Sequence, residues 1–266
     1  MANFIRSAKS GSDWTKNELL AYNIRIVPKS DMGFFGEVPE KLPENLSKEF
    51  LEYEFGRNDS LEDDSDNLLE YLDLASRSLR GQESMVDDFA RELLKSLGFE
   101  ASGRLLRIRH AIPLIICGST SLAQTDVSIL RKRSGLILLV QEDKRQINIK
   151  DPEPQVIAEA IAAFQENNRI REESGLEGID RMAFPCITMI GTFPRFYLVP
   201  VTKELSYCVI GGVYPNDTTE VLKYTPRVPN KTSDAMKNRE DRKKILQCYE
   251  SFKKFVDELE EQLRRE

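Results

Sequence analysis

The stretch TDVSILRKRSGLILLVQEDK, from Thr125 to Lys144, decides the fold of this chain. It holds nearly all of two strand-like runs, residues 124–130 and 136–143, separated by a charged link that ends in Gly135. Such runs around a polar link containing glycine are typical of a β-hairpin. The second run is nearly continuous in Leu, Ile and Val, which is typical of a strand buried on both faces. The stretch therefore predicts two antiparallel strands near the centre of a sheet.

Helices and further strands are predicted on both sides of this hairpin. Apolar residues at helical spacing predict helices over residues 67–80, 83–97 and 153–171. Apolar runs between turn residues predict strands at 104–117, 184–191 and 196–202 and near 206–213. The order helix, three strands, helix, strands predicts an α/β fold, with a mixed central sheet flanked by helices.

One core domain is predicted over residues 67–215, with an extension at each end. Residues 1–66 form an N-terminal arm that ends in an acidic loop. Its aromatic residues Trp14, Phe34 and Phe35 are expected to anchor the arm to the core, or else to stack on nucleic-acid bases. Residues 216–266 form a linker and a long C-terminal helix from about 234 to 264.

The C-terminal helix carries an apolar stripe. Its residues follow one another at spacings of 4, 3, 4, 3 and 4: Ile245, Tyr249, Phe252, Val256, Leu259 and Leu263. The stripe either packs on the core of its own chain, which we favour because it spans few heptads, or forms a coiled-coil homodimer.

Composition excludes several classes of function. The chain has 44 acidic and 38 basic residues and a net charge of −6, which argues against a general nucleic-acid coat but leaves local basic patches at 131–133 and 239–244. The single histidine, His110, excludes sites that need several, and we expect it to be packed and hydrogen-bonded. The four cysteines stand far apart and are expected to be reduced thiols. Without a membrane-length apolar run or a secretory signal, we expect an intracellular protein, cytoplasmic or nuclear.

Two acids and a lysine are predicted to converge at one end of the hairpin. If the turn is centred near Ser134, Asp126 lies opposite Glu142, and the alternation of side chains puts Glu142 and Lys144 on one face. Carboxylates this close need a shared proton, solvent or a cation. Their hard oxygen ligands suit Mg²⁺ or Mn²⁺.

This constellation resembles the PD-(D/E)XK nuclease superfamily, whose signature is an acid on one strand followed by Asp/Glu-x-Lys on the next. Asp126 and the triplet Glu142-Asp143-Lys144 match the signature, although Thr125 stands where the family has proline. Glu92 and Gln155 match acid and glutamine positions of the family's preceding and following helices. The likeness covers about residues 83–202.

The resemblance implies a restriction-endonuclease-like core that hydrolyses phosphodiester bonds of DNA or RNA with Mg²⁺ or Mn²⁺. It implies that Asp126, Glu142 and Glu92 are metal ligands, that Lys144 stabilises the attacking water or the developing charge, and that Gln155 is an auxiliary residue.

Other interpretations of the same residues remain open. The fold could serve as a catalytically inactive binding or regulatory module, which the acidic net charge favours, or as a carboxylate enzyme with another substrate. Residue by residue, Glu142 and Lys144 could form a surface ion pair, and Asp126 could begin a strand. Glu92 could border the apolar face of its helix, and Gln155 could simply belong to a first helical turn.

Overall fold

The computed structural model describes residues 6–56, 66–77, 84–131, 135–142 and 151–264, with the backbone alone for 138–142. Its strands form one seven-stranded sheet in the order β1-β7-β6-β5-β4-β3-β2. The strands are β1 (Ile24–Pro28), β2 (Arg104–Ile116), β3 (Ser119–Arg131), β4 (Gly135–Glu142), β5 (Arg181–Ile190), β6 (Phe193–Thr202) and β7 (Thr219–Tyr224). The α-helices are α1 (Lys16–Ala21), α2 (Asp31–Phe35), α3 (Lys48–Glu52), α4 (Asn67–Ser76), α5 (Ser84–Ser96), α6 (Glu153–Glu173), α7 (Lys203–Gly211) and α8 (Arg239–Arg264).

The sheet is mixed, as predicted. Strands β2, β3 and β4 form an antiparallel meander, and Arg131 pairs with Gly135 across the predicted hairpin link. Strand β4 then pairs in parallel with β5, and α6 makes the connection between them. A parallel pair needs such a crossover because a short turn cannot reverse the chain twice.

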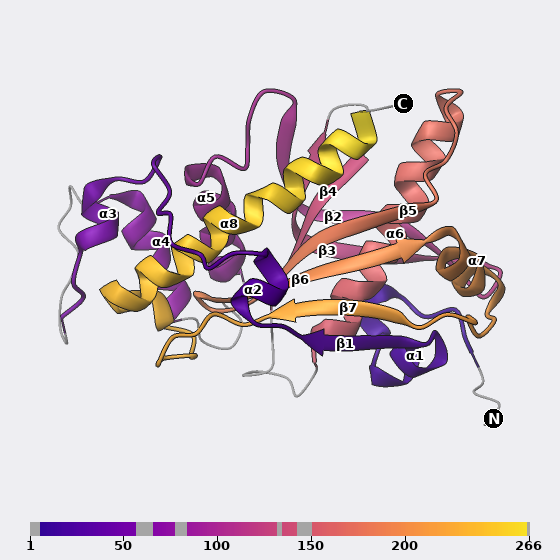
Figure 1. Ribbon diagram of the computed structural model, residues 1–266, viewed down its shortest axis with the longest axis horizontal. Coiled ribbons are helices and arrows are strands. Elements are labelled where there is room, and N and C mark those ends of the chain that lie inside the picture. Colours follow the sequence, from indigo (N-terminus) through magenta and orange to yellow (C-terminus); the bar gives the residue numbers. More distant parts are fainter. Residues whose placement is uncertain (1–5, 57–65, 78–83, 132–134, 143–150, 265–266) are drawn as a thin grey trace.

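Helices cover both faces of the sheet. In Figure 1, α8 crosses in front of the strands and α6 passes behind them. Cys186 and Met189 of β5 are three residues apart, so their side chains lie on opposite faces. The charge of Glu159 on α6 acts on Cys186, whereas the hydroxyl of Tyr249 on α8 donates to Met189 Sδ at 3.7 Å. Long helices on both faces explain why the central strands are buried on both sides.

The sheet includes strands from both sequence extensions that flank the predicted core, and both strands lie at the same edge of the sheet. Strand β1 comes from residues predicted as an arm and pairs in parallel with β7, which lies in the predicted linker. Each is a short strand whose partner lies far away in sequence, so local pattern alone does not reveal the pairing.

One predicted strand is wrong, because residues 206–213 belong largely to α7 and the turn after it. The stretch is rich in aromatic and β-branched residues, which favour strands. Caps at both ends stabilise a helix instead. The Thr202 side chain accepts a hydrogen bond from the Leu205 N–H, and Gly212 ends the helix in the left-handed conformation, with φ of 63°. The helix caps outweigh the weak propensity of the interior.

Both apolar extensions pack on the core. Trp14, Phe34 and Phe35 are buried, which confirms that they anchor the arm. The whole α8 stripe from Ile245 to Leu263 is buried as well, and Phe252 lies against Phe34 and Phe196. The core of the chain itself therefore covers the stripe that could have formed a coiled coil.

Candidate metal centre

The register of β3 and β4 differs by one residue from the predicted one. Val127 pairs with Val140, and continuing this register places Gln141, not Glu142, opposite Asp126. The cause lies in the hairpin link, because Arg131 pairs with Gly135 and not with Ile137 as the predicted register requires, a difference of two residues. An irregularity between Ile129 and Leu130, where Ile129 pairs with Leu138 but Leu130 with Leu136, then reduces this difference to one residue. A β-bulge of this kind shifts every later pair by one. The predicted pairing of Asp126 with Glu142 is therefore wrong. In a strand, a register shift of one residue moves the side chains to the opposite face of the sheet.

The structure describes only part of the predicted pair Glu142 and Lys144. The backbone of Glu142 pairs with Met189 of β5, and its side chain lies outside the description. Lys144 lies in the segment 143–150, which is outside the described residues.

Glu159 of α6 is an acid close enough to Asp126 for the two charges to interact. It is fully buried, and its Oε1 accepts a hydrogen bond from Gln155 Nε2 at 3.1 Å. Burial raises the pKa of Glu159 well above its ordinary value, and the negative charge of Asp126 raises it further. Within the described part of the chain, Glu159 Oε2 has no hydrogen-bond partner.

The sequence of α6 explains how a carboxylate comes to lie under the sheet. Pro152 and Pro154 stand at the start of the helix, where proline costs no hydrogen bond. The residues around Glu159 are apolar and mostly small, and all of them are buried: Val156, Ile157, Ala158, Ala160, Ile161, Ala162 and Ala163. Gln155 and Glu159 are four residues apart, on one side of the helix. The sequence contains this signal, an acid one turn after Gln155 in an apolar segment, although Glu159 is not among the predicted site residues.

A second polar cluster lies at the start of α6. Glu153 Oε1 accepts a hydrogen bond from the Tyr197 hydroxyl at 2.9 Å and forms an ion pair with Lys223. The Tyr197 hydroxyl is also 3.4 Å from Thr188 Oγ1. Burial raises the pKa of Tyr197, and the charge of Glu153 adds to the shift. The carboxylate of Glu153 is thus neutralised by Lys223, whereas Glu159 forms no ion pair with any of the described residues.

Of the other predicted site residues, Gln155 contacts Glu159, but the contacts of Glu92 lie elsewhere. The Glu92 carboxylate pairs with Arg91 at 2.5 Å and with Lys95 at 3.8 Å, both on α5 itself. His110 is half-buried, with its Nδ1 3.5 Å from Ser128 Oγ. Burial and the charge of Arg107 lower the pKa of His110, so a neutral imidazole is expected near pH 7.

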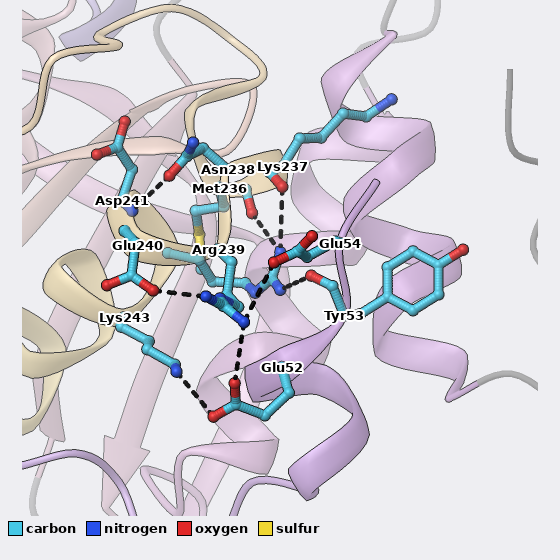
Figure 2. A network of polar contacts seen from close by, with 11 residues as sticks. Glu52, Tyr53, Glu54, Met236, Lys237, Asn238, Arg239, Glu240, Asp241 and Lys243 are labelled. Atoms are coloured by element: carbon cyan, nitrogen blue, oxygen red, sulfur yellow. Dashed lines mark hydrogen bonds and ion pairs between the residues drawn. The ribbon is translucent and has the colours of Figure 1, made fainter. Parts of the chain in front are cut away.

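Several described residues of the predicted basic patches pair with acids of the same chain. Arg131 pairs with Glu260 of α8, and residues 132–134 lie outside the description. In Figure 2, Arg239 lies between Glu52, Glu54 and Glu240, and Lys243 reaches Glu52.

Arg242, from the same segment, is fully buried. It donates to the backbone oxygens of Met236 and Tyr53, and burial lowers its pKa to about 10. This cluster fastens the arm to the start of α8.

Three ligands of the kinds most common in metal sites do not converge anywhere in the described ranges. No group of three or more His, Cys, Asp or Glu side chains that could hold a metal occurs there. What the described residues provide is a pair of carboxylates, Asp126 and Glu159, with Gln155 bound to the second.

Comparison with known proteins assigns the chain to no family. No family model matches it, and no curated protein is significantly similar to it. None of the helices in the described ranges is long and apolar enough to cross a membrane.

Proposed function

We propose that this protein is a divalent-metal-dependent nuclease that hydrolyses phosphodiester bonds of a nucleic acid. One observation carries the proposal: Glu159 is fully buried beside the charge of Asp126, and its Oε2 has no hydrogen-bond partner among the described residues. An ionised carboxylate in that position costs several kcal/mol unless it is neutralised. A cation bound between the two carboxylates removes that cost.

The oxygen ligands fit a hard divalent cation. Mg²⁺ in proteins is commonly held by one or two carboxylates, and waters and substrate phosphate oxygens complete its octahedral shell. Asp126 and Glu159 would supply the two carboxylates, and Gln155 would fix the orientation of Glu159 through the bond to its Oε1. A bound cation supplies a polarised phosphoryl oxygen and a water of lowered pKa.

The order of elements around the pair also supports the proposal. Helix α5 precedes the antiparallel strands β2, β3 and β4, and α6 then leads to β5, parallel to β4. This is the order of preceding helix, acid-bearing strand, second strand and following helix that the resemblance to PD-(D/E)XK nucleases implies. In this proposal the core is restriction-endonuclease-like.

The roles of the predicted residues change in part. Asp126 remains a metal ligand, and Glu159 replaces Glu142 as the second carboxylate. Lys144, two residues beyond the end of β4, would supply positive charge to the transition state. Glu92 is not needed, because its carboxylate pairs with Arg91 and Lys95.

Cleavage of labelled single- and double-stranded DNA and RNA tests the proposal. We expect cleavage with Mg²⁺ or Mn²⁺, none with EDTA, and loss of activity in Asp126→Asn and Glu159→Gln. Glu173→Gln is the matched control, because Glu173 is an exposed acid on the same helix. If wild-type protein cuts none of the four substrates, the enzyme proposal fails, and the inactive binding module would account for the fold.

A further inference from the structure

Strand β2 at one edge of the sheet is basic in an otherwise acidic protein. Its residues 104–116 include three arginines and one histidine but no acid, and Asp126 is the one acid of β3. Arg104 is used internally, in ion pairs with Asp257 and Glu260 of α8. Arg107 and Arg109 are exposed, and no ion pair within the described ranges involves them. Two cations on this edge are thus available to an anionic ligand.

Arg109 lies beside the candidate metal centre. The pairs Ile108–Val127 and His110–Thr125 bracket Arg109 and Asp126, so these two residues are neighbours on adjacent strands. The backbone of Arg109 is left-handed, with φ of 49°, a conformation that costs energy for a residue with a side chain. Strained residues of this kind cluster at functional sites.

The same edge is poorly suited to adding a strand from another protein. Pro113 has no N–H, and the N–H and C=O of Ile115 are bonded to the Gln165 side chain at 2.8 and 3.1 Å. Strand addition needs a row of free backbone groups along the edge. Exposed Leu105 and Ile108 alternate with the arginines and offer apolar contact instead.

We propose that the exposed edge of β2 binds the phosphate backbone of a polynucleotide, with Arg107 and Arg109 contacting phosphates and leading the strand to Asp126. This inference rests on the proposed nuclease function and names the path of its substrate. Arginine suits the task because its planar guanidinium forms paired hydrogen bonds with phosphate oxygens. Such contacts position the polynucleotide without reading its sequence.

The test is the salt dependence of binding, measured by fluorescence anisotropy in EDTA. The probes are fluorescein-labelled single-stranded DNA and RNA of one sequence, and the DNA duplex. Arg107→Gln/Arg109→Gln should weaken binding by about tenfold or more and reduce the slope of log K against log salt by about 1.4 for single strands or about 1.8 for duplex. Arg107→Lys/Arg109→Lys should retain the slope. Arg25→Gln, an exposed arginine on the opposite edge strand β1, should behave as wild type.

The outcomes separate this inference from the proposed function. If wild type binds and cleaves but the double variant keeps its affinity and slope, the β2 path is wrong and the nuclease stands. If the double variant instead loses self-association in light scattering and keeps polynucleotide affinity, the edge binds a second copy, and the inference is wrong. If wild type neither binds nor cleaves any probe, both proposals fall.

Discussion

Glu159 on α6 lies in the electric field of Asp126 on β3, and this relationship defines the candidate centre. Burial is the larger cause of the raised pKa of Glu159, and the charge of Asp126 adds to it. Without a cation, the raised pKa favours the protonated form of Glu159. A divalent cation would replace that proton, so metal binding, stability and pH are linked at this one side chain.

The stability of the metal-free protein should fall as pH rises, and Glu159→Gln should remove this dependence. The unfolded chain releases the Glu159 proton near the ordinary value of 4.5, whereas the folded protein holds it to higher pH. Above that value the folded state binds more protons, so the free energy of unfolding declines until the raised pKa is passed. At pH 8 in EDTA, Glu159→Gln should be more stable than wild type by about 1–3 kcal/mol. Urea unfolding at several pH values measures this, and equal pH slopes for both proteins would contradict it.

Metal should stabilise the wild-type fold. With Mn²⁺ at about 100 times its dissociation constant, the gain is ~2.7 kcal/mol, because the ion binds only the folded state. For a domain of this size that raises Tm by roughly 5–10 °C. Asp126→Asn deletes a charged ligand and should remove most of the shift, while Glu173→Gln should keep it. A full shift in Asp126→Asn, measured by scanning calorimetry, would place the ion elsewhere.

The variant Lys144→Ala should distinguish metal binding from catalysis. In the proposed function its ammonium acts on the transition state and not on the metal, so Lys144→Ala should retain the Mn²⁺-dependent rise in Tm but lose cleavage. The loss in kcat should be about 10²-fold or more, as for other residues that stabilise developing charge. Loss of the thermal shift together with activity would mean that Lys144 supports the fold of the site instead.

Helix α8 should act as part of the core and not as an interface. Phe252 is fully buried against Phe34 and Phe196, so Phe252→Ala should cost about 3–5 kcal/mol. Exposed Glu258 on the same helix provides the control Glu258→Ala, with an expected change within about 0.5 kcal/mol. The Tm of wild type should not depend on protein concentration. A Tm that rises with concentration would favour a dimer.

Glu260 should be the most costly acid to remove from α8. Its buried carboxylate pairs with Arg104 and Arg131 of the sheet and with Arg264 one turn further on. Glu260→Ala leaves partly buried arginines without their partner and should destabilise the fold by about 3–5 kcal/mol in urea unfolding. A change below about 1 kcal/mol would show that the pairs are no stronger than surface ion pairs.

Elements with strong local periodicity could be predicted from the sequence. Strand register and strand pairing could not, because they depend on local irregularities and on partners far away in the sequence. The helix over 83–97 and the strand over 136–143 are found at Ser84–Ser96 and Gly135–Glu142, because their apolar spacing alone defines them. Neither the pairing of Arg131 with Gly135 nor the bulge near Ile129 has such a signature, and together they set a register that differs by one residue from the one that would pair Asp126 with Glu142.

Glu159 escaped prediction for a related reason. A single acid in a helix is usually solvated, and only the packing of α6 under the sheet shows that this one is buried. Likewise, neither the pairing of β1 with β7 nor the helix caps of α7 can be derived from apolar spacing.

A crystal structure of the protein with Mn²⁺ tests the central claim most directly, because the anomalous signal locates the ion. The account predicts an ion bound by carboxylate oxygens of both Asp126 and Glu159, at about the 2.1 Å typical of octahedral Mg²⁺ sites. An ion bound elsewhere, or a Glu159 that remains without a cation at saturating Mn²⁺, would contradict it.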